Sequence, residues 1–410
     1  MVAISRLFTP AELVHRLDDH VIGQSYAKKR LSMAVYRHYL GRRLELGGNP
    51  GFGPQHQLLL GPTGVGKSLL VKTISSMLRV PTAFTAATSL VETGYVGTPV
   101  ESMFATLLDR AAGDQELAEH GIVFLDEFDK LRRAADVSRD VSGEGVQNGL
   151  LTLMDGRPVR LRHRDREVTL DSGSVLFLCT GAFAGLPAIV RRRLAREGVA
   201  LGFTGTARRA ARARDEDLLA QATPEDLIEY GIIPELVGRF AGIVPLHALS
   251  RADLERVLAE AKTSPLRAQQ RLFELHGVRL EVPADARGAL VDRALAHGLG
   301  ARALHRVVTE ALAELEFRLP RLAEQGVGAV RMTRAAIEGR SGPVFVRRSE
   351  LADWVEPFPS AEQLRFGPTA PRQRAGSARP GPRTSDPRRE YPSRRPRPAS
   401  DGPTLFENGG

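Results

Sequence analysis

The feature that most constrains the fold is a glycine-rich segment at residues 61–68, which reads Gly-Pro-Thr-Gly-Val-Gly-Lys-Ser. It follows the apolar run 58–60 and leads into a helical pattern. A strand, a glycine-rich turn and a helix in this order form a phosphate-binding loop, because glycines let backbone N–H groups surround phosphate and the helix dipole favours an anion. Lys67 is expected to reach the β- and γ-phosphates, and Ser68 to bind Mg²⁺.

A second motif, Ile-Val-Phe-Leu-Asp-Glu at residues 122–127, predicts a buried strand that ends in two carboxylates. In a parallel sheet such acids lie at the carboxyl edge, beside the phosphate loop. We expect Asp126 to help hold Mg²⁺ and Glu127 to orient the attacking water as a base. The expected cofactors are therefore ATP and Mg²⁺, with nucleotide contacts expected from Gly61, Pro62, Thr63, Gly64, Val65, Gly66, Lys67, Ser68 and Leu69.

The net positive charge is concentrated near the C-terminus. Ten arginines but only two acidic residues, Asp386 and Glu390, lie between residues 365 and 397, so this segment carries +8 of the formal net charge of +9. The same segment is rich in proline, which opposes helix and sheet formation. We predict a disordered tail at 349–410, and its basic charge leaves a nucleic-acid-associated ATPase open as one alternative.

The remaining composition argues against a membrane or secreted protein. Apolar runs stay shorter than the roughly 18 residues of a membrane span, and the first ten residues do not form a signal peptide, so we expect a cytoplasmic protein. The single cysteine, Cys179, cannot form an intramolecular disulfide or a multi-thiolate zinc site. It is expected in a buried strand, since it follows the apolar run 175–178.

Helical patterns and turn signals divide the rest of the chain. Helices are expected from Pro10 through Leu17, after a capping box at Thr9, and at 25–44, 250–275, 284–297 and 301–317, with short strands at 82–84 and 278–282. The expected fold class is α/β: a P-loop domain with a parallel sheet at 1–245, a smaller, mostly helical domain at 246–348 and the tail.

Five ordered segments together resemble the ClpX family of AAA+ unfoldases, over about residues 9–346. They are Leu-Asp-Asp-His-Val-Ile-Gly-Gln at 17–24, Gly-Tyr-Val-Gly at 94–97, Arg-Asp-Val-Ser-Gly-Glu-Gly-Val-Gln at 139–147, Gly-Ala-Phe-Ala-Gly-Leu at 181–186 and Ile-Pro-Glu-Leu-Val-Gly-Arg at 233–239. The resemblance implies an AAA+ domain followed by a small lid domain. It also implies a homo-hexamer that uses ATP to unfold proteins and deliver them to the ClpP peptidase.

The resemblance also implies roles for single residues at the nucleotide. Val21 and Ile22 would line the adenine pocket, and Thr180 stands where a polar sensor-1 residue is expected. Arg239 matches the arginine finger that reaches the ATP of a neighbouring subunit, and Arg302 matches the sensor-2 arginine. A trans-acting cation is also plausible on physical grounds, because it would neutralise charge developing on the γ-phosphate.

Other matched residues are expected to contact proteins. Glycines around Tyr95 and Val96 suggest a mobile loop with an apolar grip, although an ordinary tight turn is the alternative for that tetrapeptide alone. In the family this loop lines an axial pore that grips unfolded or tagged protein substrates, and Arg139 is assigned to the same pore. Leu201, Gly202 and Phe203 resemble the tripeptide that docks on ClpP.

Departures from the family keep other functions open. With one cysteine and a chain that begins near the AAA+ module, we expect no N-terminal zinc-binding domain. The basic segment 160–164 differs in spelling from the family's entry loop. A stand-alone protein-remodelling chaperone is therefore one alternative, and a nucleic-acid-associated AAA+ ATPase another. The Tyr-Val pair disfavours the latter, since it carries no positive charge for phosphate.

Overall fold

The computed structural model describes residues 7–91, 98–132, 143–164, 166–200, 213–298 and 300–353. All of these residues fall within one compact unit. Tyr95, Val96, Arg139, Leu201, Gly202 and Phe203 lie outside them. The predicted tail lies outside them from residue 354 on, whereas its first residues, 349–353, are ordered in a short 3-10 helix in which Leu351 is buried.

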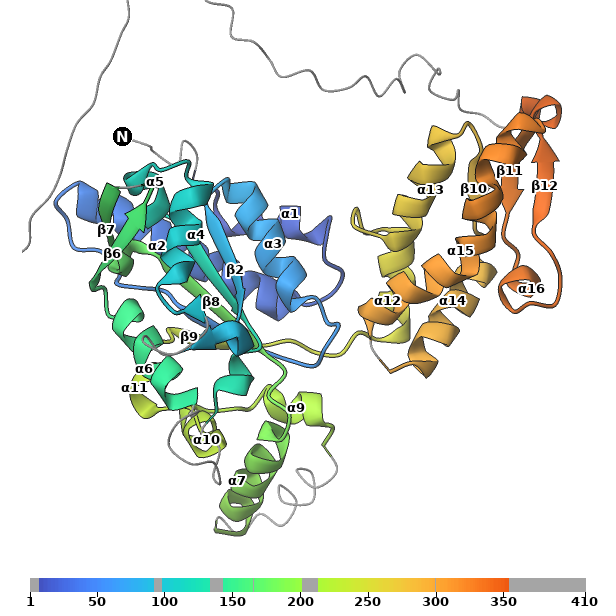
Figure 1. Ribbon diagram of the computed structural model, residues 1–410. Helices are drawn as coiled ribbons and strands as arrows, with labels where there is room; N and C mark the ends of the chain where they lie inside the picture. The colour runs from blue at the N-terminus through green and yellow to red at the C-terminus, as the bar shows by residue number, and fades with distance from the viewer. Residues whose placement is uncertain are drawn as a thin grey trace, which may run out of the picture. The chain divides into compact units, whose positions relative to one another are not determined.

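A five-stranded parallel sheet organises the first part of the chain (Figure 1). Its strand order is β2-β5-β8-β1-β9, and every neighbouring pair is parallel. The phosphate-loop strand therefore lies beside β8 and β9, both far away in the sequence. The strands are β1 (Gln57–Leu60), β2 (Thr82–Ala86), β5 (Ile122–Asp126), β8 (Leu176–Gly181) and β9 (Gly242–Pro245).

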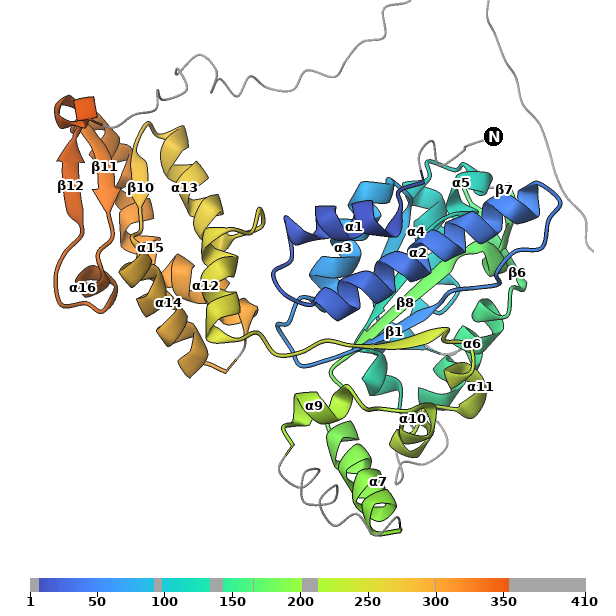
Figure 2. The ribbon, with the colours of Figure 1, turned by 180° about the vertical axis from the view of Figure 1, so that it is seen from behind.

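Helices cover both faces of this sheet, as a buried parallel sheet requires. Leu59 of β1 belongs to the core beneath α1 (Pro10–Asp18), α2 (Ser25–Leu46) and α3 (Lys67–Leu78), which Figure 2 shows together on one side. Its neighbours Leu58 and Leu60 belong to the opposite core, because side chains alternate along a strand. This second core is covered by α4 (Ser102–Arg110), α6 (Gly143–Met154), α10 (Pro224–Tyr230) and α11 (Pro234–Val237).

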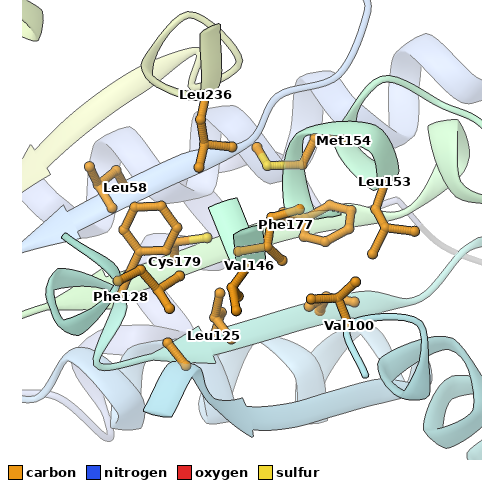
Figure 3. Close-up of a cluster of buried hydrophobic side chains, with 14 of the residues drawn as sticks. Leu58, Val100, Leu125, Phe128, Val146, Leu153, Met154, Phe177, Cys179 and Leu236 are labelled. Atoms are coloured by element: carbon orange, nitrogen blue, oxygen red, sulfur yellow. The ribbon is translucent and has the colours of Figure 1, made fainter. Parts of the chain in front are cut away.

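Figure 3 shows the second core at close range, with side chains of β1, β5 and β8 facing those of α6 and α11. Cys179 lies among them, 1% exposed, and burial raises the pKa of its thiol. Its predicted place in a buried strand is therefore confirmed. A buried thiol of this kind acts as a small apolar side chain.

Shorter elements complete the α/β part. An antiparallel hairpin, β6 (Pro158–His163) with β7 (Arg166–Asp171), contains the basic segment 160–164. The others are η1 (Ala87–Ser89), β3 (Leu90–Val91), β4 (Thr98–Pro99), α5 (Gln115–Glu119), η2 (Phe128–Leu131), η4 (Ser172–Ser174), α7 (Leu186–Ala200) and α9 (Asp215–Leu219).

Residues 249–353, which we call the helical part, have a hydrophobic core of their own. A three-stranded sheet in the order β10-β11-β12 joins its helices. Its elements are α12 (Arg251–Ala259), α13 (Pro265–Leu275), β10 (Arg279–Glu281), α14 (Ala284–Ala296), α15 (Ala301–Glu324), β11 (Val327–Arg331), α16 (Arg334–Ile337), β12 (Val344–Arg347) and η5 (Arg348–Asp353).

The predicted α/β fold with its parallel sheet and helical second part is confirmed, whereas two helix predictions were wrong in extent. The helix expected at 250–275 is broken before Pro265, whose ring disfavours helical backbone at the preceding residue, and Ser264 caps the new helix. α15 continues past Phe317 because Leu319 and Leu322 are also buried. The boundaries 1–245, 246–348 and 349–410 stay predictions.

α7 extends to Ala200, and the tripeptide 201–203 that follows it lies outside the described residues. Within the described ranges, no helix combines the length and apolar character needed to cross a bilayer.

Candidate active site

The phosphate loop connects β1 to α3, as its sequence predicts. Gly66 lies at the N-cap of α3 with φ of 99°, a left-handed conformation that favours glycine. The helix begins at Lys67, so its positive end and first backbone N–H groups lie at the loop. This arrangement suits an anion.

Lys67 is the buried cation of this loop. Its Nζ donates hydrogen bonds to the carbonyl oxygens of Gly61, at 2.6 Å, and Pro62, at 2.9 Å. Burial lowers the pKa of Lys67 to about 8, opposed by the carboxylates of Asp126 and Asp129 and reinforced by the charge of Arg302. A phosphate beside Nζ would favour the charged form, so the site fits the triphosphate of a nucleotide.

Asp126 lies at the centre of a second set of contacts at the carboxyl end of β5. Its Oδ2 accepts a hydrogen bond from Ser68 Oγ at 3.0 Å, and its Oδ1 accepts one from Thr180 Oγ1 at 2.6 Å. A hydroxyl and a carboxylate in contact are oxygen donors of the kind that Mg²⁺ binds. The residues predicted for the metal, Ser68 and Asp126, therefore fit that ion.

Glu127 follows directly and has a left-handed backbone, with φ of 58°. Such a conformation is uncommon for a residue with a side chain, and strained residues of this type cluster at functional sites. Its Oε2 accepts a hydrogen bond from Thr88 Oγ1 at 3.2 Å, and its backbone N–H donates to Asp126. These contacts fix Glu127 at the end of β5 beside the phosphate loop.

A cleft of about 1010 Å³ brings most of the predicted nucleotide residues together. The N-terminus of α15 also reaches this region, since the backbone N–H of Ala301 donates to the carbonyl of Gly64 at 3.1 Å. The predicted residues that line the cleft are Val21, Ile22, Thr63, Gly64, Val65, Gly66, Lys67, Ser68, Leu69, Asp126, Glu127 and Arg302.

The other predicted residues have different surroundings. The carbonyl oxygens of Gly61 and Pro62 accept hydrogen bonds from Lys67, and Thr180 donates one to Asp126, so all three contact residues of the cleft. Arg239 does not line the cleft. It follows α11 and forms an ion pair with Asp155, at the C-terminal end of α6.

Sequence reasoning missed the roles of two polar residues, Asp129 in the cleft and Gln24 beside the phosphate loop. Asp129 is 2% exposed, lines the cleft, and accepts a hydrogen bond from the backbone N–H of Ala182 at 3.2 Å. Its spacing of three residues from Asp126 was the only signal. Gln24 bonds both backbone groups of His247, at 2.7 and 3.1 Å, so it anchors the chain where it enters the helical part.

Comparison with known protein families agrees with this geometry. Residues 55–243 match the family described as AAA domain (Cdc48 subfamily). Residues 249–319 match the C-terminal, D2-small domain of ClpB protein. The chain is therefore an AAA ATPase, and the cleft with its phosphate loop is its candidate active site.

Curated relatives narrow the class. The ATP-dependent Clp protease ATP-binding subunit ClpX of Azotobacter vinelandii is 38% identical over 373 residues, covering 87% of this chain and 84% of the relative. The same subunit of Treponema denticola is 38% identical over 325 residues, covering 76% and 77%. ClpX 3 of Methylococcus capsulatus is 36% identical over 364 residues, covering 84% and 83%. The chain belongs to the ClpX family.

Proposed function

We propose that this ATPase is a protein unfoldase, which forms a hexamer, threads substrate proteins through an axial pore and delivers them to ClpP. The names of its relatives, which are ATP-binding subunits of the Clp protease, support the link to proteolysis. The contact of Asp126 with both Ser68 and Thr180 is the structural observation that most supports ATP hydrolysis here.

The side chains around the cleft have different roles in hydrolysis. Lys67 binds the β- and γ-phosphates, and Val21 and Ile22 supply an apolar wall for the adenine. Mg²⁺, when bound through Ser68 and Asp126, would neutralise phosphate charge. Glu127 orients the attacking water and accepts its proton, as expected for a carboxylate at the end of this strand.

Two arginines would complete the site from other directions. Arg302 lines the same cleft from the helical part, and its charge already acts on Lys67. Arg239, outside the cleft of its own chain, would supply a cation to the ATP of a neighbouring subunit. A trans arginine of this kind makes hydrolysis depend on assembly.

We assign the gripping of substrate and the docking on ClpP to segments outside the described residues. Tyr95 and Val96, with Arg139, would grip the substrate in the pore by steric and apolar contact. Leu201, Gly202 and Phe203 would dock on ClpP. Six copies of this tripeptide on one ring would need only weak individual affinity, because tethering raises their effective concentration.

The deciding experiment is degradation of a tagged, stably folded protein with ATP, in the presence and absence of ClpP from the same organism. Degradation with ClpP and unfolding without it support the proposal. Unfolding with neither binding nor stimulation of ClpP, even with a slowly hydrolysed ATP analogue, would instead favour the stand-alone remodelling chaperone.

Two variants separate the steps of that assay. Tyr95→Ala should retain ATP hydrolysis but lose unfolding, because the motor no longer grips its substrate. Phe203→Ala should retain hydrolysis and unfolding but lose stimulation of peptide cleavage by ClpP. If Tyr95→Ala unfolded a stable substrate as fast as the parent, the assigned pore contact would be wrong.

A further inference from the structure

Gln147 is a fully buried polar residue in the middle of α6, with 0% exposure. Both ends of its amide are used: Nε2 donates to the carbonyl oxygens of Leu131, at 2.7 Å, and Gly231, at 3.2 Å. Its Oε1 accepts from the backbone N–H of Ile233 at 2.8 Å. One side chain thus satisfies three backbone groups. One belongs to Leu131, 16 residues away in the sequence, and two belong to the segment of Gly231 and Ile233, 84 and 86 residues away.

These two segments belong to different functional regions. Leu131 ends η2, the turn that follows Glu127, and Gly143 at the start of α6 packs so closely on Leu131 that an added Cβ would lie 2.3 Å from its carbonyl oxygen. Ile233 is the N-cap of α11, the short helix that leads to Arg239. Gln147 therefore holds the backbone at the start of α11, which leads to Arg239, against the segment that follows Glu127.

A second contact joins α6 to the same turn. Asp155, the residue after α6, forms an ion pair with Nε of Arg239, and the two side chains are 28% and 49% exposed. The backbone N–H of Arg239 donates to Leu236 of α11 at 3.1 Å. A guanidinium that pairs through Nε keeps terminal nitrogens for another anion, so Asp155 can hold Arg239 in place without using all its donors.

We propose that Gln147 and Asp155 are positioning residues for Arg239. Gln147 fixes the backbone that leads to Arg239, and Asp155 sets the direction of its guanidinium, so that α6 presents the arginine to the nucleotide of an adjoining subunit. The inference rests on the proposed trans role of Arg239. Gln147 is the last residue of the segment 139–147. Positioning Arg239 gives this residue a role that contact with nucleotide or substrate does not provide.

The test uses rings mixed from two kinds of subunit. Receiver subunits carry Arg239→Ala and hydrolyse ATP only with a neighbour's arginine, whereas donor subunits carry Glu127→Gln and supply that arginine without hydrolysing. Gln147→Leu, which removes the amide at similar size, is then added to either the donor or the receiver. We expect ATPase activity to fall at least about tenfold further when the change is in the donor, since small displacements of a catalytic group cost up to about a hundredfold.

Asp155 provides a second variant on the surface, where folding is not at risk. Asp155→Asn in the donor should lower activity about threefold, and Asp155→Glu should restore part of it, because a carboxylate again pairs with the arginine. Asn148→Ala, an exposed neighbour on α6, is the matched control and should leave the mixed rings unchanged.

The outcomes separate this inference from the function on which it rests. Equal losses from donor and receiver would show that Gln147 is only structural, and no loss from either would also overturn the proposal. If Gln147→Leu does not fold, the Asp155 variants decide on the same criterion. Mixed rings without Gln147 or Asp155 changes that stay inactive, although each subunit binds ATP, would instead refute the trans role of Arg239.

Discussion

The α/β part and the helical part differ in where they keep their polar side chains. Among the described residues, Ser264 is the only polar side chain buried in the helical part, whereas Lys67, Asp129, Gln147 and Asp226 are among many buried in the α/β part. The helical part instead places ion pairs on helix surfaces, with spacing of four residues, as in Arg251–Glu255 and Arg306–Glu310.

This difference reflects two ways of using a polar group. A buried polar atom must be paired, and removing its partner leaves a desolvated group that costs free energy. An exposed ion pair stays solvated and contributes little. The α/β part thus holds its site by long-range polar contacts, while apolar packing holds the helical part. Substitution of a buried polar residue of the α/β part should therefore cost much stability, whereas breaking an exposed ion pair of the helical part should cost little.

The largest effect is expected at Glu127. Glu127→Gln removes the base while Lys67, Ser68 and Asp126 keep their phosphate and metal contacts, so ATP should still bind. We expect turnover to fall about 10²- to 10⁴-fold. Steady-state ATPase assays, with nucleotide binding measured in parallel, test this. Turnover within about tenfold of the parent would assign the base elsewhere.

A buried ion pair gives the next effect. Asp226 is 1% exposed, accepts two hydrogen bonds from Arg193 at 3.0 Å, and accepts one from the backbone of Thr223 at 2.9 Å. Asp226→Asn removes the buried carboxylate and leaves Arg193 only the exposed carboxylate of Glu197 as a charged partner. We expect the free energy of unfolding of the α/β part to fall by about 3 kcal/mol, measured by denaturant titration.

The matched control for Asp226 is Asp215 of α9, whose side chain is 73% exposed and pairs with Arg191, a residue of α7 like Arg193. Asp215→Asn should change the denaturation midpoint far less. Equal shifts for the two variants would contradict the contrast between buried and exposed pairs.

ATP affinity should depend on pH through Lys67. Burial lowers the pKa of this lysine to about 8, and phosphate raises it again in the complex, so binding takes up a proton above that pH. Affinity should therefore be constant below pH 8 and weaken above it, by up to about tenfold per pH unit. Equilibrium binding from pH 6.5 to 9.5 measures this, and Lys67→Arg, which does not titrate there, should flatten the profile.

The smallest effect is expected on the surface of α15. Arg306 pairs with Glu310 in water, so Arg306→Ala should leave the melting temperature unchanged. Leu304, two residues earlier and fully buried, supplies the contrast: Leu304→Ala should cost about 3 kcal/mol. A clear loss from Arg306→Ala would show that this surface is not as solvated as its exposure indicates.

Local patterns predicted the parts of the fold and of the site that are continuous in sequence. The loop 61–68, the acids ending β5 and the capping box of α1 are each spelled by neighbouring residues, because strand, turn and helix are local structures. The β10-β11-β12 sheet was only partly expected, since short strands carry weak periodicity.

Contacts between distant segments could not be predicted in this way. Nothing near Gln147 indicates that its amide bonds Gly231 and Ile233, and nothing near Asp155 indicates Arg239 as its partner. Such pairs depend on how α6 packs beside α11, which is a property of the assembled core.

The strand order also affects how the protein is made. β1 is synthesised early, but its two neighbours in the sheet, β8 and β9, end at Gly181 and Pro245. Until the ribosome has released both, the apolar run Leu58–Leu60 has no neighbouring strand of its own on either side and remains open to aggregation. The phosphate loop, although near the start of the chain, is therefore among the last parts of the α/β sheet to mature, and a nascent chain halted before β9 would be a client for chaperones.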